Sequence, residues 1–314
     1  MSDAPIVYAL PGNGPLAQVV AAHCDGERGD LWIHRFPDGE TGLRALTAPR
    51  GRDTVIVCGL DDADVRMATL HFTAATLREH GARRIVLVAP YLAYMRQDAV
   101  FLPGSGALAR HYAAWLGSLF DALVTVDPHL HRIHALRDIF AKPAEAVSAA
   151  PAIADWLAGA GPHAPLLVGP DGESEQWVAA IAARLGCPHV CFRKERRGDD
   201  DVLLQASGLA AHRGRHAVVV DDIASTAETL RGAVQALSAA GFARPLCIVV
   251  HAIFAGHAYA RLRAAGAGDV ISCNTIAHAS NRIDIRGAVA AATAAVLCGD
   301  AAAPRALAGL TREA

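Results

Sequence analysis

The stretch VVVDDIASTAETL, residues 218–230, decides the fold class that the sequence predicts. It opens with an apolar β-branched run, which is typical of a strand buried on both faces. The strand is expected to end at Asp221, and the hydroxyl residues Ser225, Thr226 and Thr229 surround the expected start of a helix. A buried strand followed by a short loop and a helix indicates the α/β class.

Short apolar runs alternate with alanine-rich segments through the rest of the chain. Further strands are predicted at TVIVCGL, RIVLVAP, ALVTVDP, PLLVGPDG and LCIVVHA, and helices at MATLHFTAATLREHG, EQWVAAIAARLG and TLRGAVQALSAAG. Gly81, Gly186 and Gly241 follow the three helical segments, where a left-handed C-terminal cap is expected. The sequence therefore predicts mainly parallel sheets flanked by helices.

The two halves of the chain resemble each other. PGNGPLAQVVAA from Pro11 is similar to PDGESEQWVAA from Pro170, and the strand–helix–glycine–strand unit around Gly81 is similar to the unit around Gly241. A nearly constant offset indicates two duplicated α/β domains, although unrelated α/β units also share this pattern. The expected boundaries are 1–148 for the first domain, 149–300 for the second and 301–314 for a tail.

Composition excludes several classes of partner. The net charge is −2, so no global positive field attracts nucleic acid or an anionic membrane, and an anion must be bound locally. No apolar stretch approaches the roughly 18 residues of a membrane span. The seven cysteines are scattered without a CxxC pair. We therefore expect a reduced, cytoplasmic protein that carries no export signal.

The loop after the two aspartates has the chemistry of a phosphate site. The N–H groups at a helix N-terminus carry partial positive charge, and nearby hydroxyls add donors. Asp221 and Asp222 would repel a bare phosphate, so we expect them to bind the hydroxyls of an attached sugar or Mg²⁺. An ordinary N-cap with an acidic first turn remains the alternative.

Five further motifs carry candidate residues, and each has a plain structural alternative. They are RFPDGET at 35–41, PYLAYMRQDAVFLPG at 90–104, TVDPHLHRI at 125–133, VGPDGESE at 168–175 and FRKERRGDDDV at 192–202. For the first motif the alternative is a common turn, and for the second it is a solvated loop arginine. The third could contain ordinary loop histidines or a zinc cluster of His129, His131 and His134. The fourth could be a plain strand-end aspartate, and the fifth a solvated charge run.

Taken in order, these motifs resemble the ribose-phosphate pyrophosphokinases, also called phosphoribosyl pyrophosphate synthetases. The loop at 221–229 by itself is also similar to that of type I phosphoribosyltransferases. The resemblance extends from about residue 8 to 290, includes VVHAIFAG and SCNTIAH, and is nearer the archaeal-type branch. It implies two duplicated phosphoribosyltransferase-like domains, the first on the ATP side and the second on the ribose 5-phosphate side.

The resemblance also implies a role for each matching residue. Lys194 and Arg196 would be catalytic, and Lys194 is one of only two lysines in the chain. The metal Mg²⁺ would contact His129 and Asp171. ATP would bind Phe36, Asp38, Gly39, Glu40, Arg96 and Gln97. Ribose 5-phosphate would bind Arg196, Asp221, Asp222, Ser225, Thr226, Ala227, Glu228 and Thr229.

The implied reaction is the Mg²⁺-dependent transfer of pyrophosphate from ATP to the 1-hydroxyl of ribose 5-phosphate. Its products are phosphoribosyl pyrophosphate and AMP. The resemblance further implies a homo-oligomer, a dimer or larger, in which neighbouring subunits complete the ATP site. A catalytically silent regulatory subunit and a type I phosphoribosyltransferase remain as alternatives.

Several positions depart from the family pattern. A carboxylate at Glu228 replaces the usual glycine of the phosphate loop and would be unfavourable if it faced the phosphate, so we expect it to point outward. Glu195 lies between the two expected catalytic cations and would weaken their field. The remaining departures are Ala99, Ser105, Glu173 and Ser174. Together they keep the silent subunit open as an alternative.

Overall fold

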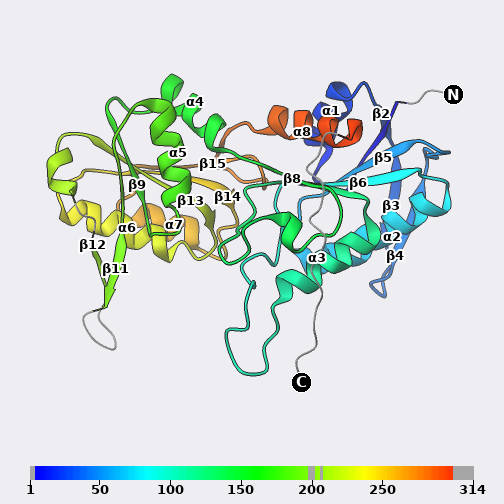
Figure 1. Cartoon of the computed structure of the whole chain (residues 1–314), viewed down its shortest axis with the longest axis horizontal. Helices are drawn as coiled ribbons and strands as arrows, with labels where there is room; N and C mark the ends of the chain where they lie inside the picture. The colour runs from blue at the N-terminus through cyan, green and yellow to red at the C-terminus, as the bar shows by residue number, and fades with distance from the viewer. Residues whose placement is uncertain (1–3, 197–201, 206–207, 300–314) are drawn as a thin grey trace. The chain divides into compact units, whose positions relative to one another are not determined.

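The computed structural model describes residues 4–196, 202–205 and 208–299. The chain forms two compact units (Figure 1). Unit 1 runs from the N-terminus to Val147 and also includes the segment that begins at Arg286, whereas unit 2 comprises Ser148–Ile285. The expected tail at 301–314 lies outside the described residues, as do residues 197–201 of the charged motif.

Unit 1 is built around a parallel sheet of six strands, in the order β2-β1-β5-β6-β7-β8. Its elements are β1 (Ile6–Ala9), α1 (Gly14–His23), β2 (Glu27–Gly29), β3 (Leu31–Arg35), β4 (Thr41–Ala45), β5 (Asp53–Val57), α2 (Ala63–Glu79), β6 (Arg84–Ala89), α3 (Leu108–Leu119), β7 (Ala122–Val126), the 3₁₀ turn η1 (Leu136–Asp138), β8 (Ala144–Val147) and α8 (Arg286–Cys298).

Unit 2 contains a second parallel sheet of six strands, in the order β10-β9-β13-β14-β15-β16. Its elements are α4 (Ala150–Ala160), β9 (Pro165–Gly169), α5 (Glu175–Leu185), β10 (His189–Cys191), β11 (Arg193–Arg196), β12 (Val202–Gln205), η2 (Leu209–His212), β13 (His216–Ala224), α6 (Glu228–Ala239), β14 (Leu246–Ala252), α7 (Ala258–Ala264), β15 (Asp269–Cys273) and β16 (Asn281–Ile283).

The two sheets have the same strand order, which confirms the predicted duplication. In each unit the first strand lies next to the second and third, and the remaining strands follow in chain order. Each unit also inserts an antiparallel hairpin before its third sheet strand, β3–β4 in unit 1 and β11–β12 in unit 2. The RFPDGET motif and the described residues 193–196 of the FRKERRGDDDV motif therefore lie on equivalent hairpins of the two units.

Burial explains why the apolar runs form central strands. Every residue of β5 and β7 is buried, as are those of β14. These runs lack polar alternation because helices cover both faces of a parallel sheet. Gly81, Gly186 and Gly241 adopt positive φ angles of 86°, 64° and 89° after their helices, as predicted.

The predicted end of the strand at Asp221 is wrong. Strand β13 continues through Asp221 and Asp222 to Ala224, and its last residues pair in parallel register with β14. Ile223 is the register partner of His251, and Ala224 that of Ala252. The polar side chains therefore lie on a strand whose backbone is already paired, and a local sequence pattern does not reveal that pairing.

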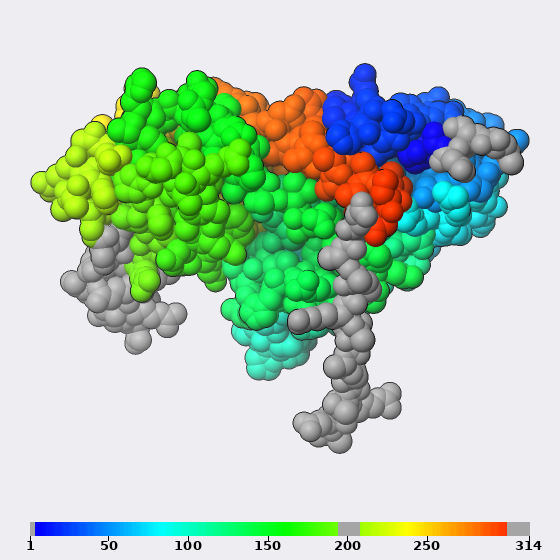
Figure 2. All heavy atoms as spheres, turned by 45° about the horizontal axis from the view of Figure 1, so that its top comes forward, coloured from blue at the N-terminus to red at the C-terminus, as the bar shows by residue number. Residues whose placement is uncertain are grey.

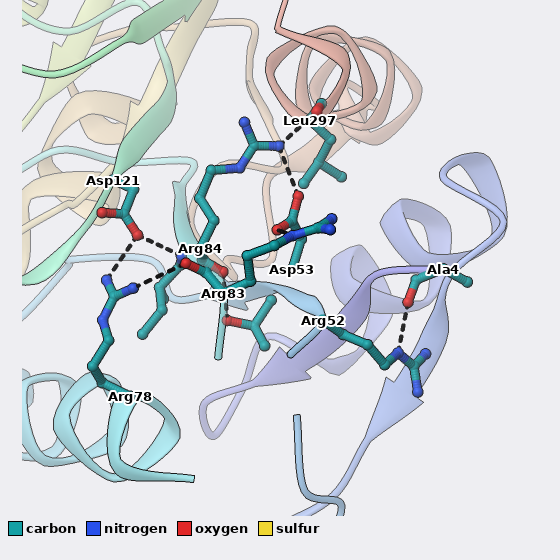
Figure 3. Close-up of polar contacts among 10 residues, drawn as sticks. Ala4, Arg52, Asp53, Arg78, Arg83, Arg84, Asp121 and Leu297 are labelled. Carbon is teal, nitrogen blue, oxygen red and sulfur yellow. Dashed lines mark hydrogen bonds and ion pairs between the residues drawn. The ribbon is translucent and has the colours of Figure 1, made fainter. Parts of the chain in front are cut away.

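Helix α8 packs in unit 1, although its residues fall within the range expected for the second domain. Val289, Ala290 and Val296 are buried, and the helix contacts α1 (Figure 2). Arg84 donates one hydrogen bond to Asp53, at 2.9 Å, and another to the carbonyl of Leu297, at 2.6 Å (Figure 3). An arginine of β6 thus binds one of the unpaired carbonyls at the end of α8.

Among the described residues, no helix is both long enough and apolar enough to cross a membrane.

Candidate active site

The candidate substrate site of unit 2 lies where the parallel strands reach their carboxyl ends. Ligands of open α/β sheets bind at this edge, because the loops that follow adjacent strands meet there. Asp171 follows β9, and Asp221 and Asp222 lie near the end of β13, the strand beside β9. The sheet therefore brings two separate sequence motifs to one edge.

The loop between β13 and α6 presents a helix N-terminus without a side-chain cap. Ala227 is the N-cap residue, with a left-handed φ of 59°, and its methyl group can accept no hydrogen bond from the first turn of α6. The start of the loop is fixed, because the N–H groups of Phe254 and Ala255 donate to the carbonyls of Ala224 and Ser225 at 2.7 and 3.0 Å. This geometry suits an anion.

The two aspartates are adjacent carboxylates whose negative charges repel each other. Asp222 is 3% exposed, and its N–H donates to Oδ1 of Asp221 at 3.0 Å. Desolvation raises the pKa of Asp221 well above its usual value, and the negative charges of Asp222 and Asp171 raise it further. A cation or hydroxyl donors would stabilise the ionised forms. The arrangement can therefore bind a metal ion or a sugar.

The Asp171 loop is held by its own hydrogen bonds. Oδ1 of Asp171 accepts from the N–H groups of Glu173 and Ser174, at 3.1 and 3.2 Å, and the Ser174 hydroxyl donates to the Asp171 carbonyl at 2.6 Å. A Cβ on Gly169 would lie 2.6 Å from both the Ser174 hydroxyl and Cys191 Sγ. Ser174, a departure from the family pattern, thus stabilises the turn that positions Asp171.

Glu228 begins helix α6 and pairs with Arg231 one turn later. Nε of Arg231 donates to the Glu228 carboxylate at 2.9 Å, and about half of the glutamate side chain (51%) is exposed. This ion pair on the solvent-exposed surface of the helix agrees with the expectation that the carboxylate points outward.

The structure describes only the backbone of the expected catalytic residues. Lys194 and Arg196 lie on β11 and pair with Leu204 and Val202 of β12. The two basic residues therefore belong to a hairpin that follows β10, the neighbour of β9 in the sheet. The side chain of Glu195, between them, also lies outside the described part of the chain.

In unit 1 the RFPDGET motif forms the tip of the β3–β4 hairpin. The N–H of Phe36 donates to the Glu40 carbonyl at 2.8 Å, the Asp38 carboxylate accepts from the Glu40 N–H at 3.1 Å, and Gly39 has a φ of 89°. Phe36 remains 42% exposed and makes an edge contact with His34. The tip therefore presents an aromatic ring and two acidic residues to solvent.

Arg96 and Gln97 lie exposed on the long loop between β6 and α3, which extends away from the helices of unit 1 (Figure 1). The Gln97 carbonyl accepts from the Ala109 N–H at 3.0 Å, which ties this loop to α3. The Ser105 hydroxyl closes a turn by donating to the Leu102 carbonyl at 2.8 Å. Ser105 therefore has a structural role in this loop.

His129 lies on the loop after β7, where its ring contacts that of His131 with Nε2 atoms 2.6 Å apart. Among the described residues of unit 1, no third histidine, cysteine or carboxylate completes a ligand set with this pair. His134 is therefore not brought together with the other two histidines.

Sequence reasoning missed the ion pair that joins these two loops of unit 1. The side chain of Asp98 is 2% exposed and accepts from the Arg132 guanidinium at 3.0 Å and from its backbone N–H at 3.2 Å. The same guanidinium lies 5.2 Å from the centroid of the Phe101 ring. Both residues stand within quoted motifs, but nothing in their spacing indicates that they pair.

Comparisons with known proteins agree with this geometry. Residues 6–118 match the N-terminal domain of ribose phosphate pyrophosphokinase, and residues 137–285 match the phosphoribosyl transferase domain. A ribose-phosphate pyrophosphokinase of Methanopyrus kandleri is 31% identical over 91% of this chain and 98% of its own. That of Methanosarcina acetivorans is 32% identical over 89% and 97%.

A solved structure, the phosphoribosylpyrophosphate synthetase of Mycobacterium smegmatis, has the same fold. Its TM-score is 0.81 at 23% identity, over 94% of this chain and 99% of that one. The fold and the loop after β13 thus define a transferase built from two phosphoribosyltransferase-like domains. Within that class, the chain belongs to the ribose-phosphate pyrophosphokinase family.

Proposed function

We propose that this protein transfers pyrophosphate from ATP to the 1-hydroxyl of ribose 5-phosphate, with Mg²⁺, and releases AMP. The observation that carries the proposal is the loop after β13. There an N-terminus of α6 without a side-chain cap lies next to Asp221, whose pKa is raised by burial and by the negative charges of Asp222 and Asp171. A sugar phosphate satisfies both features, since its phosphate suits the helix and its hydroxyls suit the carboxylates.

The 5-phosphate would bind the N–H groups and hydroxyls of residues 225–229, and Asp221 and Asp222 would bind the ribose hydroxyls or the metal. Glu228 would contribute its backbone, because its side chain pairs with Arg231. The ATP contacts would be Phe36, Asp38, Gly39, Glu40, Arg96 and Gln97, with adenine stacked on Phe36. An arginine fork suits phosphate oxygens.

The residues of unit 2 fit Mg²⁺, because Asp171 and Asp221 supply the oxygen donors that a hard cation prefers. Asp171 would be a metal contact on the ribose side, and His129 on the ATP side. The bound ion would neutralise charge on the transferred phosphates. Lys194 and Arg196 would stabilise charge that develops on these phosphates as the 1-oxygen attacks the β-phosphorus and AMP departs.

We also propose a homo-oligomer, a dimer or larger, in a reducing cytoplasm. The support is a set of exposed apolar side chains on the β3–β4 hairpin, just after it and on α2, which contacts β4. They are Trp32, Phe36, Leu46, Val65 and Phe72, each at least 42% exposed. Exposed apolar side chains on neighbouring elements are typical of an interaction surface. All seven cysteines lie in the described residues, and none of them forms a disulfide. Analytical ultracentrifugation tests the assembly, and a monomer at micromolar concentration contradicts it.

The reaction is tested by incubating the purified protein with ATP, Mg²⁺ and ribose 5-phosphate. We expect AMP and phosphoribosyl pyrophosphate in equal amounts. A silent subunit would bind ribose 5-phosphate without forming AMP. A phosphoribosyltransferase would instead consume phosphoribosyl pyrophosphate in the presence of a nucleobase.

Replacing Lys194 by alanine tests the transition-state role. Because a cation there acts on developing charge, kcat should fall by about 10²–10³-fold while the Kd of ribose 5-phosphate changes little. The control is Lys142→Ala, which removes the other, exposed lysine and should leave kcat unchanged. Equal losses of turnover and of binding would argue against the proposed role.

A further inference from the structure

Two sequence segments of unit 2, VVHAIFAG and SCNTIAH, have no role in the proposed reaction. The first contains the end of β14 and the loop after it, and the second contains the last two residues of β15 and the loop after them. The structure brings them together through two side chains, because the ring centroids of Phe254 and His278 lie 4.9 Å apart. Tyr259 of α7 contacts both rings, at 5.2 and 5.0 Å.

The backbone of Phe254 holds the start of the phosphate-binding loop. Its N–H donates to the Ala224 carbonyl at 2.7 Å, and the next N–H, of Ala255, donates to the Ser225 carbonyl at 3.0 Å. The φ and ψ angles of Ala224 and Ser225 determine where Thr226 and the first turn of α6 begin. The position of Phe254 therefore affects the position of the N–H groups that would bind the phosphate.

Phe254 holds this position in an unfavourable backbone conformation. Its φ is +41°, in the left-handed region, which is unfavourable for a bulky residue. The cost must be offset by contacts, and the side chain is 7% exposed against Tyr259 and His278. The ring contacts thus stabilise the conformation that directs the two N–H groups at the loop.

His278 is fixed in turn by a polar chain that leads to β15. Its Nδ1 lies 2.7 Å from the Ser280 hydroxyl and accepts from the Ser280 N–H at 3.1 Å. The Ser280 hydroxyl lies 2.7 Å from that of Ser272, and both serines are buried. The imidazole therefore has a defined orientation against Phe254.

We propose that Phe254 and His278 are positioning residues that set the geometry of the phosphate-binding loop, and so the affinity for ribose 5-phosphate. The inference rests on the proposed function for the identity of the ligand, whereas its structural part concerns the loop alone. Neither side chain contacts the reacting atoms in this scheme. Their effect is expected on the ribose 5-phosphate side and not on the ATP side.

The test compares Phe254→Leu, His278→Ala and His278→Asn with the control Phe242→Leu. Phe242 is also a buried phenylalanine of the unit 2 core, at 4% exposed, but lies before β14, at the opposite end of that strand. We expect the KM of ribose 5-phosphate to rise at least tenfold in Phe254→Leu and His278→Ala, with the KM of ATP within twofold of wild type. His278→Asn, which keeps an acceptor for Ser280, should lie closer to wild type.

Hydrogen exchange of the ligand-free proteins tests the loop without any substrate. Amides of residues 225–230 should exchange at least tenfold faster in Phe254→Leu than in wild type, and at the wild-type rate in Phe242→Leu. Unchanged exchange and unchanged KM in Phe254→Leu, or equal changes in Phe242→Leu, would overturn the inference. If wild type forms no AMP and binds no ribose 5-phosphate, the proposed function fails, while the exchange result still decides whether these residues position the loop.

Discussion

At the scale of single residues, Asp221 and Asp222 are adjacent carboxylates at the candidate site of unit 2. The two carboxylates stay close together because the backbone of β13 is held in the sheet. Asp171 adds a third negative charge from the neighbouring loop. Burial of Asp221 raises its pKa, and these like charges raise it further, so the ionised form of Asp221 destabilises the folded protein. This local instability is the property that a metal ion or a ribose would relieve.

We predict that Asp221→Asn stabilises the ligand-free protein while it impairs turnover. Removing one of the like charges should raise Tm by about 2–4 °C at pH 8, equivalent to roughly 1 kcal/mol. The gain should shrink as pH falls, because the wild-type carboxyl becomes protonated below its raised pKa and no longer repels its neighbours. Calorimetry in the presence of a chelator measures this change.

The matched control is Asp155→Asn, which removes an exposed carboxylate of the same unit that pairs with Arg184 at 3.0 Å. Its Tm should change by less than about 1 °C, since exposed ion pairs contribute little. A lower Tm for Asp221→Asn than for wild type would show that the carboxylate is stabilised in the folded protein.

Glu228→Gln should change the KM of ribose 5-phosphate by less than twofold. The carboxylate already pairs with Arg231, and this exposed pair contributes only about 0.2–0.5 kcal/mol to stability. Steady-state kinetics at saturating ATP measure the effect. A tenfold decrease in KM would mean that the carboxylate repels the bound phosphate, contrary to its position in the structure.

At the scale of elements, unit 1 connects two loops through one buried carboxylate. Asp98 follows Arg96 and Gln97 on the β6–α3 loop, and Arg132 follows His129 on the loop after β7. The buried carboxylate accepts hydrogen bonds from both the guanidinium and the backbone N–H of Arg132, and these bonds hold the two loops together. This interaction therefore links the candidate contacts Arg96 and Gln97 to the candidate contact His129.

Arg132→Ala is accordingly expected to raise the KM of ATP about tenfold and to leave the KM of ribose 5-phosphate unchanged. Loss of the guanidinium leaves Asp98 buried without its charged partner, which costs roughly 1–3 kcal/mol of stability. The exposed Arg137 of the same unit provides the control Arg137→Ala. A double mutant with Asp98→Asn that shows additive losses in ATP binding would contradict the coupling.

At the scale of the whole molecule, the chain completes unit 1 last. It leaves unit 1 at Val147, forms unit 2 and returns as α8, which packs on α1 and receives the hydrogen bond of Arg84. Burial of a valine contributes about 1.5–3 kcal/mol, and α8 buries Val289 and Val296. Net stability is only about 5–15 kcal/mol for a typical domain, so this helix is a substantial part of unit 1.

We therefore predict that residues 148–285 expressed alone unfold cooperatively, whereas residues 1–147 alone do not. Adding a synthetic peptide of residues 286–299 to the fragment 1–147 should restore a cooperative transition, because the peptide replaces α8. Thermal unfolding followed by circular dichroism measures both. A fragment 1–147 as stable as the full chain would show that α8 contributes little to unit 1.

Much of this molecule is determined by local sequence. Apolar β-branched runs such as residues 218–220 form strands, and Gly81, Gly186 and Gly241 end helices, because burial and backbone conformation act over a few residues. The repeated order of these signals sufficed to predict two α/β domains. The ordered motifs likewise predicted the family to which the chain belongs.

The tertiary structure alone decided the features that depend on partners distant in sequence. The continuation of β13 to Ala224 requires pairing with β14, the pairing of Asp98 with Arg132 joins two loops, and the place of α8 depends on packing against a helix more than 260 residues earlier. The sequence by itself determined which segments are strands, helices and candidate ligand loops. Only packing and long-range hydrogen bonding determined which of them meet, because those free energies depend on neighbours that local periodicity does not encode.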